Sequence, residues 1–131
     1  MGDELRTVLY VDDEPDIREV VKLSLGLMAT LTVHCCASGE QALQELPGLH
    51  PDLVLLDVMM PEMDGTTVLR RMREDPALRD IPVMFMTAKA LPEEVARFHA
   101  LGAAGVIAKP FDPMRLAKDV LAKWNGLKHD A

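Results

Sequence analysis

The sequence is poor in aromatic residues, and it has no long apolar run. Aromatic residues make up 4% of the 131 residues, whereas nine methionines are present to fill gaps in a core. No run reaches the roughly 18 apolar residues that a membrane helix needs. The N-terminal Met1-Gly2-Asp3-Glu4 lacks the basic and apolar parts of a signal peptide. We therefore expect a cytoplasmic protein without a membrane partner.

Cysteine is also scarce. The only two cysteines, Cys35 and Cys36, are neighbours in the chain. In a strand they point to opposite faces, so a disulfide between them would be strained. Two cysteines in a chain long enough for an ample core are typical of a reducing compartment. His34 beside them makes a metal site an option, but no second cluster of ligands is visible, which favours an ordinary strand.

Basic residues are fewer than acidic residues. Lys and Arg number 14 against 21 Asp and Glu, which gives a formal net charge of -7. Because phosphate backbones repel an acidic domain, we expect no nucleic-acid partner. The densest basic group, formed by Arg70, Arg71 and Arg73, is typical of a solvated helix face.

Short apolar runs alternate with helix-like segments along the whole chain. Strands are predicted at residues 7–11, 31–35, 53–56, 81–86 and 105–108. Apolar residues at helical spacing follow each of these runs. This alternation predicts a single α/β domain over residues 1–131, with its core at about 6–125. Five parallel strands would be covered on both faces by five helices.

Capping and turn residues mark the ends of the predicted helices. The predicted starts are at Pro15, at the capping box of Ser38 and Gln41, at Asp64 and at Asp112-Pro113. The predicted stops are at Pro47-Gly48, Asp75-Pro76, Gly102 and Gly126. The inner faces of the last two helices are predicted at Leu91, Val95 and Phe98, and at Leu116, Val120 and Trp124.

Four of the apolar runs end on reactive polar residues. Asp12 and Asp13 follow the first run, Asp57 the third, Thr87 the fourth and Lys109 the fifth. Because the carboxyl ends of parallel strands share one edge of a sheet, these side chains should meet in a single crevice. Three carboxylates that close together favour a hard divalent cation between them. Mg²⁺ fits best, and Mn²⁺ is not excluded.

Asp57 stands alone after a central apolar run, a suitable position for a nucleophile. A carboxylate can form an acyl phosphate, and positioned positive charge stabilises a phosphoryl group in transfer. Each of the polar residues, taken singly, is also explained as a helix cap, a strand residue or a surface residue. Their joint placement at one edge predicts a site for a divalent cation and a phosphoryl group.

The chain closely resembles the receiver domain of two-component response regulators over about residues 6–125. The matching motifs are Val11-Asp12-Asp13-Glu14-Pro15, Leu56-Asp57-Val58-Met59-Met60-Pro61, Met63-Asp64-Gly65, Met86-Thr87-Ala88 and Lys109-Pro110-Phe111. The resemblance implies a flavodoxin-like, doubly wound sheet of strand order 2-1-3-4-5. It implies the function of a stand-alone receiver of the chemotaxis or phosphorelay type.

The resemblance also assigns roles to the residues of the crevice. Asp57 would accept a phosphoryl group from a phosphohistidine, Lys109 would pair with that group, and Thr87 would move onto it. The peptide between Lys109 and Pro110 is expected to be cis. The implied arrangement of Mg²⁺ and its waters uses the side chains of Asp12, Asp13 and Asp57 and the backbone carbonyl of Met59.

The implied partners are proteins. A sensor histidine kinase or a histidine phosphotransfer protein would donate the phosphoryl group, and a downstream target would read the phosphorylated form. The domain would catalyse only its own phosphotransfer and dephosphorylation, and it is not expected to be an enzyme of bulk turnover. Because the chain ends with the fifth predicted helix, no attached output domain is expected, and the chain is either a stand-alone regulator or a fragment of a larger one.

Two positions depart from the usual pattern of the family. Val106 stands where receivers usually carry an aromatic residue, and valine cannot make the inward rotation that accompanies movement of the Thr side chain. Either the loop after Thr87 carries the change alone, or the output surface differs. Met59, two places after Asp57, offers an attacking water no strong hydrogen bond, so we expect a long-lived phosphorylated form.

Three other functions fit the sequence less well. A phosphohydrolase of the haloacid-dehalogenase type needs a second aspartate two places after its nucleophile, where this chain has Met59. A flavodoxin needs a phosphate-binding loop after the first strand, where Asp12, Asp13 and Glu14 would repel a phosphate. A degenerate receiver that only binds proteins is disfavoured by the intact acidic set.

Overall fold

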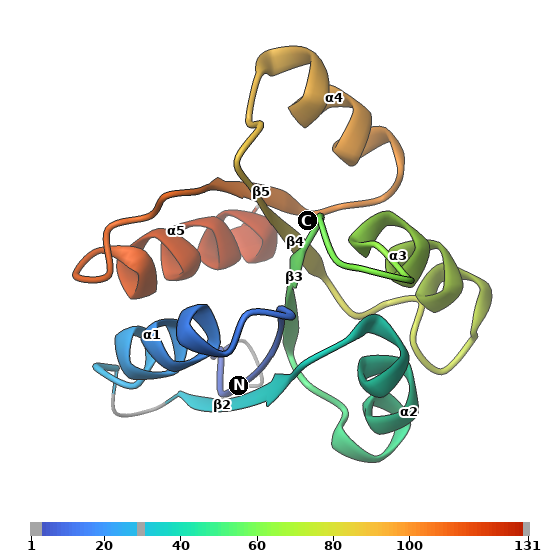
Figure 1. Cartoon of the computed structure of the whole chain (residues 1–131), viewed down its shortest axis with the longest axis horizontal. Helices are drawn as coiled ribbons and strands as arrows, with labels where there is room; N and C mark the ends of the chain where they lie inside the picture. The colour runs from blue at the N-terminus through green and yellow to red at the C-terminus, as the bar shows by residue number, and fades with distance from the viewer. Residues whose placement is uncertain (1–3, 29–30, 130–131) are drawn as a thin grey trace.

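A parallel sheet lies at the centre of the molecule (Figure 1). The computed structural model describes residues 4–28 and 31–129. The strands are β1 (Thr7–Val11), β2 (Thr32–Cys36), β3 (Leu53–Asp57), β4 (Val83–Thr87) and β5 (Gly105–Ala108). They pair in the order β2-β1-β3-β4-β5. This confirms the predicted doubly wound, flavodoxin-like topology and makes β2 and β5 the edge strands.

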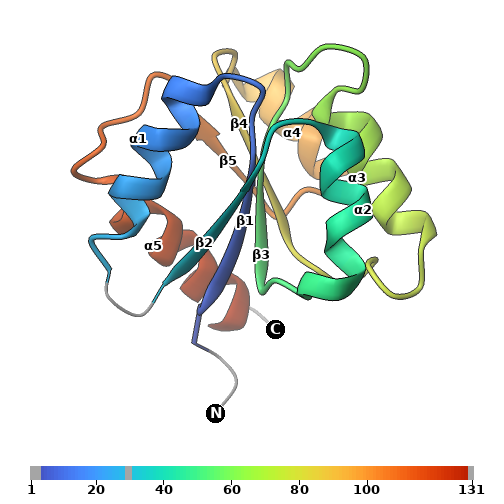
Figure 2. The ribbon, with the colours of Figure 1, turned by 60° about the horizontal axis from the view of Figure 1, so that its bottom comes forward.

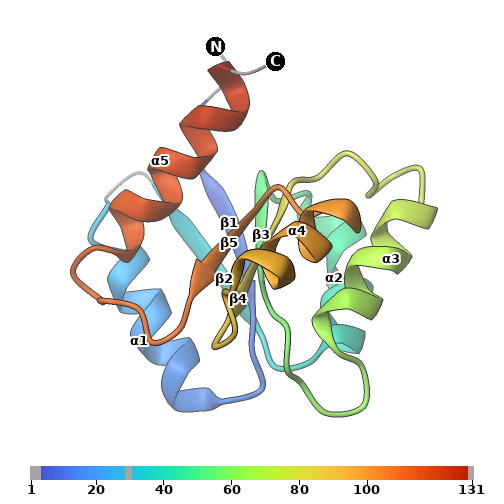
Figure 3. The same ribbon diagram turned by 90° about the horizontal axis from the view of Figure 1, so that it is seen from above.

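Helices cover both faces of the sheet (Figure 2). They are α1 (Pro15–Leu25), α2 (Gly39–Leu49), α3 (Gly65–Glu74), α4 (Pro92–Ala100) and α5 (Leu116–His129). The view from above separates α1 and α5 on one side from α2, α3 and α4 on the other (Figure 3). Two apolar clusters follow the same division, one on each face of the sheet.

The core is built from aliphatic and methionine side chains. Every residue of β3 and β4 is buried, as expected for strands covered on both faces. Met72, Met84 and Met86 are fully buried in a chain with few aromatics. Trp124 of α5 is buried in the cluster beneath α1 and α5, which confirms its predicted place on the inner face of that helix.

Several predicted helix ends are confirmed by hydrogen bonds. Ser38 Oγ accepts from Gln41 N at 3.1 Å, and Asp64 Oδ1 accepts from Thr67 N at 3.0 Å. Gly102 follows α4 with a φ of 107°, a conformation that favours glycine. The two hydrogen bonds cap helix starts, and the glycine conformation suits a helix end, at positions that the sequence predicted.

Two predicted helix stops are wrong. Pro47 and Gly48 lie inside α2, which ends at Leu49. Gly126 lies inside α5. Tertiary packing outweighs local propensity at both positions, although a helix-interior glycine costs about 1 kcal/mol and a helix-interior proline about 3 kcal/mol. Buried Leu46 and buried Trp124 hold the two helices against the core close to these positions.

The last helix begins later than predicted. A turn occupies the predicted start, with Asp112 Oδ1 accepting from Met114 N at 2.9 Å, and α5 begins at Leu116.

Helix α4 is less buried than predicted. Only Phe98 is buried on this helix, whereas Leu91, predicted to face inward, is 56% exposed. Strand β2 begins at Thr32 and β4 at Val83, which is one and two residues later than predicted.

Arg73 does not belong to a purely solvated helix face. Its guanidinium donates to the backbone carbonyls of Arg79, Ile81 and Gly102, at 2.9, 3.0 and 3.0 Å. These bonds join the end of α3 to the loops before β4 and after α4. The sequence prediction was therefore wrong for this arginine, because its three acceptors are backbone groups that only the fold brings together.

Candidate functional site

Three carboxylates gather at the carboxyl edge of the sheet. Asp12 directly follows β1, and Asp57 is the last residue of the neighbouring β3. One oxygen each of Asp12, Asp13 and Asp57 can be chosen so that all three lie within 4.8 Å of one another. Asp12 and Asp57 are buried, and Asp13 is half-buried. The three carboxylates therefore meet at one edge of the sheet, as predicted.

Lys109 lies between two of these carboxylates. Its Nζ is 3.1 Å from Asp12 Oδ2 and 3.2 Å from Asp57 Oδ1. The Lys109 backbone N–H donates to the carbonyl of Thr87 at 2.8 Å, and the peptide to Pro110 is cis, as the resemblance implied. The structure thus brings Lys109 to the acidic residues from a strand that is not adjacent to β1 or β3.

Asp12 is the most firmly held of the acidic residues. Tyr10 Oη donates to Asp12 Oδ2 at 2.6 Å, and the backbone N–H of Glu14 donates to Asp12 Oδ1 at 3.0 Å. Arg18 Nη1 donates to the Asp12 carbonyl at 2.8 Å. Tyr10 was missed in the sequence. Strand alternation could have found it, because residues two apart in a strand share a face.

The site perturbs the protonation of its own groups. Burial, with the nearby charge of Asp12, raises the pKa of Asp57 to about 6, although Lys109 and a backbone hydrogen bond from Met59 act in the opposite direction. Burial disfavours the charge of Lys109, but Asp12 and Asp57 together raise its pKa above the ordinary value. Burial and the bond to Asp12 raise the pKa of Tyr10, so its hydroxyl stays a donor.

Thr87 and Met59 lie at the same edge in less direct positions. The Thr87 hydroxyl is buried and accepts a hydrogen bond from the backbone N–H of Lys89 at 3.0 Å, within its own loop. Met59 contributes its backbone to Asp57, whereas its side chain is 77% exposed. Val106 of β5 is half-buried against the cluster that includes Phe85 and Phe98.

A glycine permits the close approach of α3 to the end of β3. A Cβ atom on Gly65 would lie 2.5 Å from the Asp57 carbonyl oxygen and 3.1 Å from the Phe85 ring. Real Cβ atoms essentially never lie within 3.0 Å of such an atom, so the carbonyl oxygen excludes a side chain here. The Gly65 backbone N–H instead donates to the Val58 carbonyl at 2.9 Å. Gly65 therefore helps to fix the backbone that carries Asp57.

The donor set of the crevice fits a hard cation. All three clustered side chains offer oxygen, and Mg²⁺ is bound in proteins by one or two carboxylates with waters and phosphate oxygens. One ammonium offsets only part of the negative charge of three carboxylates. A cation and a phosphoryl group placed here would meet ligands and counter-charges of the right chemical type.

Comparison with known proteins defines the class. The model of the response regulator receiver domain matches residues 8–121. The chain is 36% identical over 110 residues to the response regulator Rre1 of Synechocystis, which covers 84% of this chain and 48% of that protein. It is 38% identical over 108 residues to the regulatory protein AtoC of Escherichia coli, which covers 82% of this chain and 23% of that protein.

Solved structures show the same architecture. The chemotaxis response regulator CheY4 of Vibrio cholerae has a TM-score of 0.83 and 31% identity, over 92% of this chain and 99% of that one. The N-terminal domain of a response regulator receiver protein from Methanoculleus marisnigri has a TM-score of 0.74 and 40% identity, over 91% and 96%. The chain belongs to the receiver-domain family of two-component response regulators.

The matched region is only part of the longer relatives. The chain spans about half or less of the first curated relatives it matches, 48% of Rre1 and 23% of AtoC. In the part of the chain that the structure describes, no helix combines the length and the apolar character that crossing a bilayer requires.

Proposed function

We propose that Asp57 is the phosphoacceptor and takes a phosphoryl group from a phosphohistidine of a sensor histidine kinase or a histidine phosphotransfer protein. The observation that carries this proposal is the contact of Lys109 with Asp57 and Asp12 in a crevice of three carboxylates. Family membership supports the same reaction, since receiver domains act in two-component signalling.

The chemistry is a nucleophilic displacement at phosphorus. An Asp57 carboxylate oxygen forms the new O–P bond while the P–N bond of the phosphohistidine breaks, and the leaving imidazole nitrogen takes a proton from solvent. With a pKa of about 6, Asp57 is predominantly ionised at neutral pH and able to attack. Lys109 then pairs with one phosphoryl oxygen. The Thr87 hydroxyl moves away from the Lys89 backbone N–H and donates a hydrogen bond to another phosphoryl oxygen.

A divalent cation completes the site. Asp12, Asp13, Asp57 and the backbone carbonyl of Met59 would hold Mg²⁺, or Mn²⁺ in its place, together with waters. When bound, the cation neutralises the charge of the carboxylates and of the incoming phosphoryl group. Tyr10 and Lys109 both contact Asp12 Oδ2 and keep that carboxylate in position.

Phosphorylation then alters a protein-binding surface. It adds negative charge and acceptor oxygens at Asp57, which favours one of two conformations that a downstream protein distinguishes. The domain is a phosphoacceptor that catalyses only its own phosphorylation and dephosphorylation. Some relatives are named as transcriptional regulators, and one as DNA-binding. For this acidic domain we propose a protein target in the cytoplasm, with no direct nucleic-acid contact.

The test is incubation with acetyl phosphate, with and without Mg²⁺, followed by intact-mass measurement. The parent protein should gain the mass of one phosphoryl group only when Mg²⁺ is present, and Asp57→Asn should gain none. Asp80→Asn is the matched control, because Asp80 is exposed and precedes β4, whereas Thr87 lies at the opposite end of that strand. A gain that persists in Asp57→Asn, or without any divalent cation, would contradict the proposal.

A further inference from the structure

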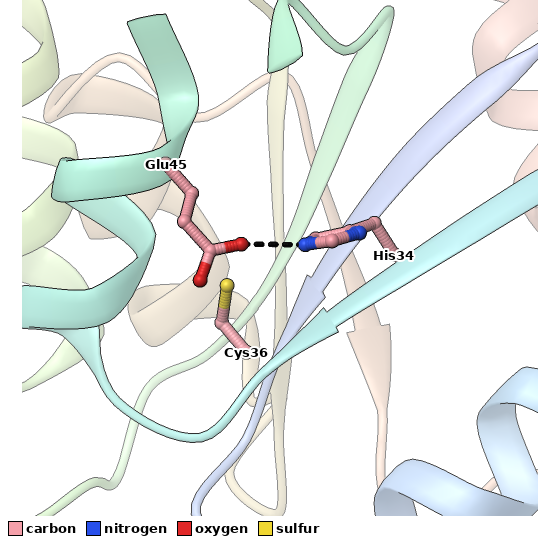
Figure 4. A group of neighbouring side chains, drawn as sticks. All are labelled: His34, Cys36 and Glu45. Atoms are coloured by element: carbon pink, nitrogen blue, oxygen red, sulfur yellow. Dashed lines mark hydrogen bonds and ion pairs between the residues drawn. The ribbon is translucent and has the colours of Figure 1, made fainter. Parts of the chain in front are cut away.

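A second group of metal-ligating side chains lies between β2 and α2, outside the acidic crevice. His34, Cys36 and Glu45 each offer one ligand atom, and these atoms lie within 4.8 Å of one another. The three side chains converge from the strand and the helix (Figure 4). The sequence favoured an ordinary strand at His34 because no further ligand was visible. That reason fails, since folding brings Glu45 to this strand.

The arrangement follows from the periodicities of the two elements. His34 and Cys36 are two residues apart on β2, so both face α2, while Cys35 faces the opposite cluster. His34 Nε2 lies 2.5 Å from Glu45 Oε1. The Cys36 Sγ lies within 4.8 Å of a Glu45 carboxylate oxygen, and Figure 4 shows the sulfur pointing at that carboxylate.

A neighbouring side chain holds the carboxylate in place. Gln41, one turn before Glu45 on α2, donates from Nε2 to Glu45 Oε2 at 2.8 Å. Its amide oxygen accepts from the backbone N–H of Ala37 at 2.8 Å, just after β2. Outer contacts of this kind orient metal ligands in proteins. The hydrogen bonds from His34 and Gln41 also lower the pKa of Glu45, so the carboxylate is available in its ionised form.

We propose that His34, Cys36 and Glu45 form a binding site for a borderline transition-metal ion, Zn²⁺ in the first place. One nitrogen, one sulfur and one oxygen donor suit Zn²⁺ with a water as fourth ligand. The same mixture does not suit Mg²⁺ or Ca²⁺, which take oxygen ligands. The chain thus offers two cation sites of different chemical type, an all-oxygen one at the strand ends and a mixed one beside β2.

Access and protonation are compatible with this site. β2 is an edge strand, and the side chains of His34 and Glu45 are partly exposed, so both can rotate outward to admit an ion. Cys36 is buried and supplies a fixed sulfur. Burial, with the charge of Glu45, raises the pKa of the Cys36 thiol to about 12. Binding of Zn²⁺ breaks its S–H bond, releases the proton to solvent and forms an S–Zn bond.

Zn²⁺ also accepts carboxylate ligands, so the acidic residues are a competing site. The two regions adjoin, because the Cys36 carbonyl accepts from the Asp12 backbone N–H at 3.2 Å. The titration therefore uses reduced protein with saturating Mg²⁺, and Zn²⁺ alone as the probe in calorimetry. We expect one equivalent of Zn²⁺ to bind. Asp57→Asn should leave this binding unchanged, whereas loss in that variant would assign the ion to the acidic crevice and overturn the proposal.

Ligand variants test the identity of the site. Glu45→Gln and His34→Gln change partly exposed side chains and should weaken Zn²⁺ binding by about tenfold or more. Cys36→Ala should do the same, with Cys35→Ala as the matched control that binds Zn²⁺ like the parent. Unchanged affinity in Glu45→Gln and His34→Gln, or no binding by the parent in the micromolar range, would refute the site.

Co²⁺ gives a readout that does not depend on stability. The parent and Cys35→Ala should show the near-ultraviolet charge-transfer absorption of a cobalt–thiolate bond, and Cys36→Ala should lack it. Far-ultraviolet circular dichroism of each variant checks that the fold is retained. A charge-transfer band that survives in Cys36→Ala, or that disappears in Cys35→Ala, would also overturn the assignment.

Discussion

The hydroxyl of Tyr10 donates a 2.6 Å hydrogen bond to Asp12 Oδ2, the same oxygen that Lys109 Nζ contacts at 3.1 Å. Both Tyr10 and Asp12 are fully buried. A buried carboxylate depends on such partners, because the protein must replace the water that it loses. This phenol is therefore a structural part of the acidic site.

The first prediction concerns Tyr10→Phe, which removes one hydroxyl and keeps the ring. We expect the free energy of unfolding to fall by about 1.5–3 kcal/mol, the usual cost of losing a hydrogen bond to a charged group. Urea denaturation without Mg²⁺ measures this loss. A double-mutant cycle with Asp12→Asn is the control, and additive losses would show that the two side chains do not interact.

The second prediction follows from the raised pKa of Asp57. Its folded pKa of about 6 lies above the unfolded value of 3.8, so between these values the folded protein binds more protons than the unfolded one. The free energy of unfolding contributed by this group is therefore highest below about pH 4, and it decreases as the pH rises through about 6. The groups that face Asp57 are Asp12, Asp13 and Lys109.

Asp57→Asn removes this dependence. Without Mg²⁺ the variant should be more stable than the parent at about pH 7, by on the order of 2–3 kcal/mol, and the difference should vanish near pH 4. Mg²⁺ should stabilise the parent at neutral pH much more than the variant. Denaturation of parent and variant across pH 4–7 measures this difference. Asp80→Asn serves as the control, and a parent–variant difference that does not change with pH would contradict the prediction.

The sequence predicted the fold well where periodicity and burial agree. The strands predicted at residues 7–11, 53–56 and 81–86 appear as β1, β3 and β4, because a continuous apolar run is typical of a strand buried on both faces. Helix ends were less predictable. Gly126 lies inside α5 because Trp124 packs against the core. Local helix propensity does not include such a tertiary contact.

The sequence predicted which residues lie together at the candidate site, but it did not predict all of their contacts. Asp12, Asp57 and Lys109 stand at strand ends, and parallel topology alone brings strand ends together. The bond from Tyr10 to Asp12 and the approach of Glu45 to Cys36 depend on side chains that meet across elements or along one strand face. Alternation along β1 could have indicated the first contact, whereas the second depends on how α2 packs against β2.

The third prediction concerns the close approach at Gly65. Gly65→Ala places a methyl group 2.5 Å from the Asp57 carbonyl oxygen, so the end of β3 or α3 must shift. We expect a loss of about 1–3 kcal/mol in the free energy of unfolding, and slower phosphorylation by acetyl phosphate because Asp57 moves. Gly48→Ala is the matched control, since its added methyl group meets no atom within 4 Å.

Gly48 lies inside α2, so the control has an expected sign of its own. Alanine in a helix interior is favoured over glycine by about 1 kcal/mol, and Gly48→Ala should raise stability by up to that amount. Phosphorylation should proceed at the parent rate. Equal effects of the two substitutions on stability would show that the space at Gly65 is not restrictive.

The fourth prediction concerns the lifetime of the phosphorylated form. Met59 has a largely exposed side chain two residues after Asp57 and offers an attacking water no strong hydrogen bond. In Met59→Asn the side-chain amide can hold a water near the phosphoryl group. We expect loss of phosphate to be faster by about tenfold, which corresponds to about 1.4 kcal/mol of barrier.

Intact mass followed over time after removal of acetyl phosphate measures this rate. Met114→Asn is the matched control, because Met114 is similarly exposed and lies in the turn before α5. Its phosphorylated form should decay at the parent rate. An unchanged rate in Met114→Asn would show that the faster loss of phosphate depends on the amide at position 59. A parent protein that loses phosphate faster than Met59→Asn would refute the idea that Met59 hinders the attacking water.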